Sequence, residues 1–152
     1  MADLRAASGR TGGASGRRER PARTLFHYEQ TVTFKASPRA VYEALMDPRR
    51  HAAFTGNPAR IDRRPGGRFT AYGGYLEGIT TDLVPNKKIV QFWRSQNWPR
   101  FHYSIVTFAL SPVRGGTRLH FTQEGVPNND YRAKRSGWPS AYWEKLKAFL
   151  KR

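Results

Sequence analysis

Hydrophobic and polar positions alternate most clearly in the middle of the chain. Ile79, Thr81 and Leu83 recur at every second position, and a run of β-branched and aromatic residues follows at 89–93. Alternation of this kind is typical of strands that bury one face, so these three residues are expected to share a face. The pair Pro85-Asn86 separates the two runs and favours a turn. The segment therefore predicts a β-hairpin.

The same alternation predicts further strands on both sides of this hairpin. Together the predicted strands cover 28–34, 59–64, 68–72, 75–84, 89–94, 101–110 and 117–123. Glycine pairs lie between several of them, where tight turns require positive φ. In the last two predicted strands, apolar residues occupy every second position and therefore share one face. These residues are predicted to point inward: Val106, Phe108, Leu110, Leu119 and Phe121. The pattern favours an antiparallel meander.

Two short helices are predicted after the first strand. Ser37 followed by Pro38 is typical of an N-cap and a first helical position. Asp47 followed by Pro48 repeats this signal, so a second helix is expected to run through Phe54.

A longer helix is predicted at the C-terminal end. Trp138, Tyr142, Leu146 and Phe149 recur at helical spacing. Pro139 lies within this pattern and lacks the N–H that a helix interior needs. Either a kink or a helix that starts afresh with Pro139 in its first turn is expected. Periodicity alone thus supports a mostly antiparallel α+β domain.

Composition separates the first residues from the rest. Residues 1–24 are rich in Gly, Ser, Ala and Arg, which cannot bury enough apolar surface to fold. We predict a disordered basic tail over 1–24 and one domain over 25–152. A secretory signal and a membrane span both need an apolar run that this sequence lacks. The chain has no cysteine, which excludes disulfides and thiolate sites. A cytoplasmic protein is predicted.

The net charge of +16 raises the question of a nucleic-acid partner. The basic residues are scattered in small groups, and no nucleic-acid-binding motif gathers them. A basic solvated surface is therefore predicted, and nucleic acid is not the expected partner.

Chemical motifs are sparse. The four histidines show no metal-ligand spacing, and fingerprints of nucleotide sites or nucleophiles are absent, so no catalytic residue, cofactor or metal is predicted. Glu77, Asp82, Arg94 and His102 are the ionisable residues of central strands that could face an apolar cavity. The alternative is that they face outward or form structural pairs. Aromatic residues, with Tyr75 and Trp143 among them, could line a pocket or simply build the core.

Several short motifs occur together in a specific order. They are Asp82-Leu83-Val84-Pro85, the lysines before Ile89-Val90, Trp93-Arg94 and Trp98-Pro99. The chain thereby resembles the C-terminal domain of the Hsp90 ATPase activator Aha1, an AHSA1-like domain of the START/Bet v 1-like (SRPBCC) superfamily. The resemblance covers residues 28–150 and includes Gly66-Gly67-Arg68-Phe69, Gly78, Gly125-Val126-Pro127, Gly137-Trp138 and Tyr142.

The resemblance implies a helix-grip (Bet v 1-like/START-like) fold, a curved antiparallel sheet with two short helices and a long C-terminal helix over a cavity. The residues expected at that cavity are Phe69, Tyr72, Trp93, Val106, Phe108, Leu119, Phe121, Trp138 and Tyr142.

Three functions follow as alternatives. The first is non-enzymatic contact with an Hsp90-type chaperone, for which we expect Arg49, Arg50, Lys87 and Lys88 to be the contact residues. The second is binding of a hydrophobic small molecule or lipid in the cavity, and the third is cyclase-like chemistry there. Aha1 also has an N-terminal domain that this sequence does not show, so full ATPase stimulation is not expected.

Overall fold

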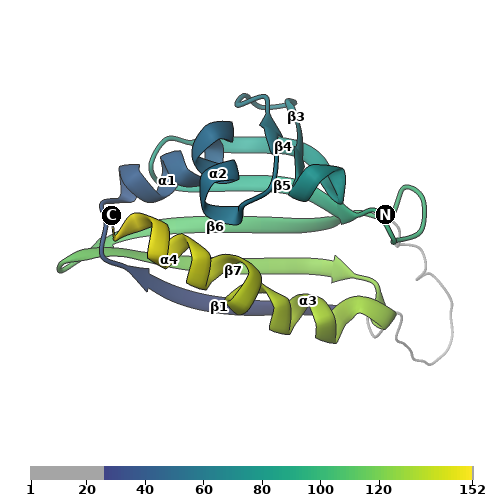
Figure 1. Cartoon of the computed structure of the whole chain (residues 1–152). Helices are drawn as coiled ribbons and strands as arrows, with labels where there is room; N and C mark the ends of the chain where they lie inside the picture. The colour runs from purple at the N-terminus through teal and green to yellow at the C-terminus, as the bar shows by residue number, and fades with distance from the viewer. Residues whose placement is uncertain (1–25, 152) are drawn as a thin grey trace, which may run out of the picture.

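Seven antiparallel strands form one curved sheet in the computed structural model, which describes residues 26–151 (Figure 1). The strands are β1 (Phe26–Phe34), β2 (Arg60–Ile61), β3 (Arg68–Ala71), β4 (Leu76–Val84), β5 (Lys88–Ser95), β6 (Ser104–Val113) and β7 (Gly116–Val126). Their spatial order is β1-β7-β6-β5-β4-β3-β2. Strands β2 to β7 therefore form a meander, and β1 pairs with the last strand. The predicted basic tail, residues 1–24, lies outside the described residues and stays a prediction.

The helices lie on one face of this sheet. Helices α1 (Pro38–Met46) and α2 (Pro48–Thr55) connect β1 to β2, and the C-terminal helix runs as α3 (Tyr131–Trp138), η5 (Pro139–Trp143) and α4 (Glu144–Leu150). Figure 1 shows the C-terminal helix along the sheet, with α2 beside α4. The predicted inward face of β6 and β7 is confirmed, because all five residues are at most 6% exposed: Val106, Phe108, Leu110, Leu119 and Phe121.

Side-chain caps explain the two short helices. Ser37 Oγ accepts a hydrogen bond from the Ala40 N–H at 3.1 Å, which confirms the predicted N-cap of α1. Asp47 ends α1 and begins α2, since its Oδ1 accepts from the Arg49 N–H at 3.3 Å. Each cap thus pairs one of the N–H groups that the first turn of its helix leaves without an intrahelical partner.

Two strands differ from their predicted bounds: β2 is shorter than 59–64, and β6 has the predicted length but lies three residues later than 101–110. Strand β2 ends at Ile61 because the chain turns at once, with the Arg64 N–H donating to the Asp62 carbonyl at 2.9 Å. Strand β6 begins at Ser104 and not at Phe101, whose φ of 64° belongs to a turn.

The prediction that Ile79, Thr81 and Leu83 share a face is wrong. A β-bulge follows Thr80, which shifts the pairing register of β4 against β5. Thr80 is fully buried, Thr81 is exposed, and Leu83 pairs with the buried Ile89. One extra residue reverses the parity of everything that follows it.

The predicted hairpin between β4 and β5 is confirmed. The Lys87 N–H donates to the Val84 carbonyl at 2.9 Å, and Asn86 has a φ of 64°. Proline followed by a residue with positive φ is the pattern of a type II turn. The turn places Lys87 in solvent.

Pro139 neither restarts the C-terminal helix nor breaks it. Its φ of −58° and ψ of −51° are helical, and a widened π turn follows, in which the Glu144 N–H donates to the Pro139 carbonyl. The Arg135 carbonyl, which lacks a proline N–H as its partner, accepts from Gln30 Nε2 at 2.7 Å. A side chain of β1 thus satisfies the group that the proline orphans, and the widened turn takes the place of the predicted kink.

A buried glutamine connects the sheet to this helix. Gln123 on β7 is 0% exposed, and its Oε1 accepts hydrogen bonds from the Tyr28 hydroxyl and from Trp138 Nε1. Its Nε2 donates to Ser104 Oγ at 2.9 Å. The Tyr28 hydroxyl on β1, the Ser104 hydroxyl on β6 and the Trp138 indole N–H on the helix therefore all pair with one side-chain amide.

Candidate functional site

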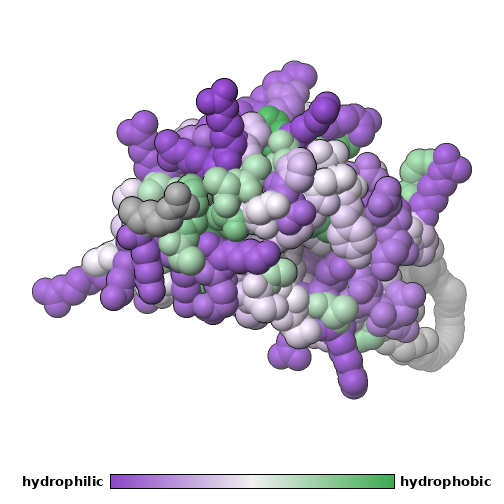
Figure 2. All heavy atoms as spheres, viewed as in Figure 1, coloured by the Kyte–Doolittle hydropathy of each residue, from purple (hydrophilic) through white to green (hydrophobic). Residues whose placement is uncertain are grey.

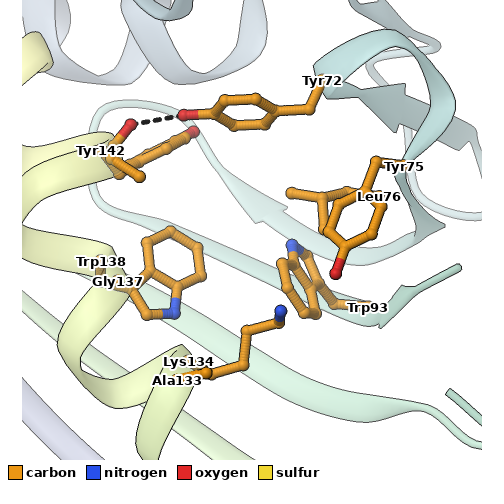
Figure 3. A pocket seen from close by; sticks show the side chains of 10 residues that line it. Tyr72, Tyr75, Leu76, Trp93, Ala133, Lys134, Gly137, Trp138 and Tyr142 are labelled. Carbon is orange, nitrogen blue, oxygen red and sulfur yellow. Dashed lines mark hydrogen bonds between the residues drawn. The ribbon is translucent and has the colours of Figure 1, made fainter. Parts of the chain in front are cut away.

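A pocket of about 220 Å³ opens between the C-terminal helix and strands β4 and β5 (Figure 3). Most of its lining residues are aromatic or small: Tyr72, Tyr75, Leu76, Trp93, Ala133, Lys134, Gly137, Trp138, Ala141 and Tyr142. The floor is buried, whereas Tyr75 and the two alanines are exposed at the rim. The site is therefore an apolar hollow that solvent can reach.

Two tyrosines form one side of the pocket. Tyr72 begins the turn η3 (Tyr72–Gly74), and Tyr75 directly follows that turn. Tyr72 has a φ of 52°, and its hydroxyl donates to the carbonyl of Ala141 on the helix (Figure 3). The Tyr75 hydroxyl donates to Asn97 Oδ1 at 3.0 Å. Both rings are thus held in place at their polar ends.

The floor of the pocket consists of packed rings. The centroids of Trp93 and Trp138 lie 5.8 Å apart, and Trp138 meets Tyr142 edge-on at 4.9 Å. Because these rings touch one another, a ligand would lie across their surface and not between them.

Lys134 reaches over the mouth of the pocket (Figure 3). Its side chain is 16% exposed, and its Nζ lies 3.1 Å from Asp130 Oδ2 and 5.4 Å from the centre of the Tyr75 ring. The same carboxylate oxygen accepts from Trp98 Nε1 at 2.6 Å. Asp130 therefore positions the lysine and joins α3 to the loop that follows β5.

A second cavity of about 30 Å³ shares four lining residues with the pocket. Its other lining residues include polar side chains, among them His51. His51 Nε2 lies 2.7 Å from the Tyr142 hydroxyl, while His51 Nδ1 has no hydrogen-bond partner among residues 26–151. Burial lowers the pKa of His51 to about 4 and raises that of Tyr142 well above its usual value of 10. The imidazole is therefore neutral at pH 7.

The buried His51 is expected to make the stability of the fold sensitive to acid. Its folded pKa of about 4 lies below the ordinary value of 6.5. Below pH 6.5 the unfolded chain therefore binds a proton that the folded chain excludes, and stability falls as the pH drops toward 4. When the pH falls from about 7 to about 4.5, the free energy of unfolding of the wild type should fall by about 2.5 kcal/mol more than that of His51→Gln. Urea denaturation at the two pH values measures this difference. A His27→Gln variant, changed at an exposed histidine of β1, should lose as much stability as the wild type does. Equal losses in all three proteins would contradict the prediction.

The predicted cavity residues divide into three groups. The larger pocket is lined by Tyr72, Trp93, Trp138 and Tyr142. Phe69 and Phe108 line the smaller cavity. The remaining three are 0% exposed and are not among the lining residues of either cavity: Val106, Leu119 and Phe121. A ligand at any of these residues stays a prediction.

Sequence reasoning found Trp138 and Tyr142 on the helix side of the pocket but missed the small residues there. Ala133, Gly137 and Ala141 line it and lie four residues apart, so three small side chains follow one another along the helix. That spacing was a usable signal, because small residues leave space wherever a helix meets its neighbour. Lys134 was also missed.

The four ionisable candidates of the central strands have structural partners. Arg94 Nη1 lies 2.7 Å from Glu77 Oε2, and Arg94 Nη2 donates to the Trp98 carbonyl at 2.7 Å. Asp82 pairs with Lys88 at 3.4 Å, and His102 Nε2 lies 2.7 Å from the Gly125 carbonyl. The alternative of structural pairing is confirmed. Within residues 26–151, no three His, Asp or Glu side chains gather as metal ligands would.

The predicted partner-binding cations lie on α2 and at the hairpin tip. Arg50 Nε lies 3.3 Å from Asp47, and Lys88 pairs with Asp82, so acidic neighbours offset both charges. Arg49 and Lys87 are exposed, and no acidic side chain of residues 26–151 forms an ion pair with either. Figure 2 shows hydrophilic side chains over most of the visible face. In the described part of the chain, no helix has the length and apolar character to cross a membrane.

The curved sheet around a C-terminal helix, with a pocket between them, defines a helix-grip domain of the START/Bet v 1-like class, as predicted. An HSP90 activator from Plasmodium falciparum has a similar structure, with a TM-score of 0.77 and 25% identity over 82% of this chain and 96% of that chain. A protein from Chromobacterium violaceum has a TM-score of 0.70 and 26% identity over 83% of this chain and 97% of its own.

The chain belongs to the AHSA1 family, the activator of Hsp90 ATPase homolog 1-like proteins, whose family model matches residues 35–151. The human activator of 90 kDa heat shock protein ATPase homolog 1 is 35% identical over 115 residues, which cover 76% of this chain and 34% of the human protein. A Dictyostelium discoideum homolog is 32% identical over 116 residues, 75% of this chain and 30% of that protein. The chain thus spans about a third of the length of these curated relatives.

Proposed function

We propose that this chain is a non-enzymatic, cytoplasmic AHSA1-type domain that binds a chaperone of the Hsp90 type. Family membership carries the proposal, since the human relative and the Plasmodium falciparum structure are both named as activators of this chaperone. The chain spans only 34% of the human relative, so the proposal concerns binding and not full ATPase stimulation.

The charge of the surface supports an acidic partner. Most acidic side chains in residues 26–151 already face a cation of this chain, for example Glu43 with Arg63 and Asp62 with Arg64. Exposed cations such as Lys87 are left to interact with other molecules. Charges at the edge of an interface mainly raise the association rate. The hairpin tip is therefore the proposed contact.

Reversing the charge of this tip should slow association. The variant Lys87→Glu with Lys88→Glu is expected to bind a purified Hsp90-type chaperone with an association rate reduced about tenfold at low salt, and less at high salt. Surface plasmon resonance at two salt concentrations measures this. The fold should be unchanged, since the Lys88–Asp82 pair is solvent-exposed and contributes little.

A matched control carries the same charge change at the opposite end of the sheet. Arg132 and Arg135 are exposed on α3, which contacts the loop after β5. Arg132→Glu with Arg135→Glu should bind nearly as the wild type does. If both variants lowered the association rate equally, the effect would come from net charge and not from the hairpin tip. If only the control lowered it, the contact would lie on α3. If the wild type does not bind at all, the chaperone proposal is wrong.

The pocket favours a second candidate function, the binding of a small hydrophobic molecule. Aromatic walls with a single charged group at the mouth are typical of ligand sites. Glu77, Arg94 and His102 are held in structural contacts and are not among its lining residues, so they lend no support to cyclase-like chemistry.

A further inference from the structure

We propose that the pocket binds a small planar aromatic molecule of one or two fused rings, which carries an anionic hydrogen-bond acceptor that meets Lys134. The inference rests on the second candidate function, that the pocket takes a small molecule, and it names the chemical class. It is independent of chaperone contact, because the pocket and the hairpin tip share no residue.

The size of the pocket limits the part of a ligand that it can enclose. Its volume is about 220 Å³, below the range of about 300–1,000 Å³ that drug-sized ligands occupy. An apolar cavity of about 150 Å³ accepts benzene. The pocket can therefore enclose one or two fused rings, whereas a sterol or a long acyl chain would extend out of its mouth.

The walls favour a flat molecule over a flexible one. Trp93 and Trp138 form a continuous floor of rings, and Tyr72 and Tyr75 flank it. Rings gain from stacked and edge-on contacts beyond the area they bury. Both tyrosines are held by hydrogen bonds to Ala141 and Asn97, so the shape exists before the ligand arrives. A flexible alkyl chain would lose rotational freedom there, and a rigid ring would not.

Lys134 supplies the polar contact. Its ammonium group carries three N–H donors, and the structure pairs it with one carboxylate, Asp130, at 3.1 Å. Its side chain is 16% exposed and lies against the face of Tyr75 at the mouth. A carboxylate on the ligand would therefore accept a hydrogen bond from an ammonium N–H that Asp130 leaves open, at a site partly removed from water, and would share the charge of the lysine with Asp130.

Two probes with equal numbers of carbon atoms and the same head group test the class. Isothermal calorimetry should give 2-naphthoate a Kd on the order of 100 µM, and undecanoate should bind at least about tenfold more weakly. If undecanoate binds as well or better, the aromatic class is overturned while the ligand-binding function stands. If neither probe binds, both the function and the inference fail.

Two variants locate the binding. Lys134→Met should weaken the binding of 2-naphthoate about tenfold and leave the binding of naphthalene, which has no acceptor, unchanged. An unchanged affinity for 2-naphthoate would overturn the role of Lys134.

Gly137→Leu should abolish the binding of 2-naphthoate and of naphthalene, because Gly137 lines the pocket. The variant should fold, since a Cβ at Gly137 meets nothing within 4 Å. Ala148→Leu, on the exposed side of α4, is the matched control and should bind normally. Unimpaired binding by Gly137→Leu would place the probes elsewhere and overturn the site.

Discussion

Gln123→Leu is expected to lower the free energy of unfolding by about 4 kcal/mol, because it removes the shared partner of several buried groups. The Tyr28 hydroxyl and Trp138 Nε1 would lose their acceptor, and Ser104 Oγ would lose a donor. Each buried polar group left without a partner costs about 1–3 kcal/mol. Leucine differs from glutamine in shape as well as in hydrogen bonding, so the loss is compared with that of the same substitution at another buried glutamine. Urea denaturation followed by circular dichroism measures it.

Gln91→Leu is the matched control. Gln91 is also buried on the same face of the sheet, but its Nε2 donates a single long hydrogen bond of 3.3 Å to Thr80 Oγ1. The same substitution there should cost about 1 kcal/mol. Similar losses in both variants would show that Gln123 is not the centre of the network.

Gly78→Ala is expected to destabilise the fold by about 3 kcal/mol or more, since overpacking against a fixed backbone has no inexpensive relaxation. A Cβ at this position would lie 1.9 Å from the Phe92 carbonyl oxygen and 2.7 Å from two carbons of the Phe69 ring. The neighbouring strand would have to move away, and the β4–β5 pairing would be lost locally. Thermal melting monitored by circular dichroism gives the change.

The same substitution, glycine to alanine, should raise the stability of the fold at Gly137 instead of lowering it. No atom lies within 4 Å of a Cβ built there, and the residue is helical. Gly137→Ala is therefore expected to raise stability by about 0.5–1 kcal/mol through the lower entropy of the unfolded chain. A melting temperature that falls in Gly137→Ala and not in Gly78→Ala would contradict both expectations.

The architecture was predictable because its signals are local. The caps at Ser37 and Asp47, the turn at Asn86 and the inward parity of β6 and β7 can all be seen within a few residues. The bulge after Thr80 was not predictable, because it depends on how β4 registers against β5. The outcome at Pro139 depends on Gln30, a residue of the first strand that no local rule connects to it.

The site was predictable only in part. Aromatic residues on the right faces pointed to a pocket, and Trp93 and Tyr142 line it, yet Phe121 has the same pattern and is fully buried core. Sequence parity tells which face a residue occupies but not whether its neighbours fill the space in front of it. Asp130 lies four residues before Lys134, a spacing at which the two side chains can pair on a helix, but the contact of Lys134 with the Tyr75 ring has no local signal in the sequence.

The pairing of β1 with β7 also constrains when the domain can fold during synthesis. Phe34 lies opposite Thr117 and Phe26 opposite Val126, so the first strand finds its partner only after nearly the whole sheet has been translated. Gln30 meets the Arg135 carbonyl later still. Contacts so distant in sequence make folding slow. Until then the nascent chain presents β1 as an unpaired strand edge, which attracts other chains. A newly made copy is therefore expected to depend on protection by other proteins while it is still on the ribosome.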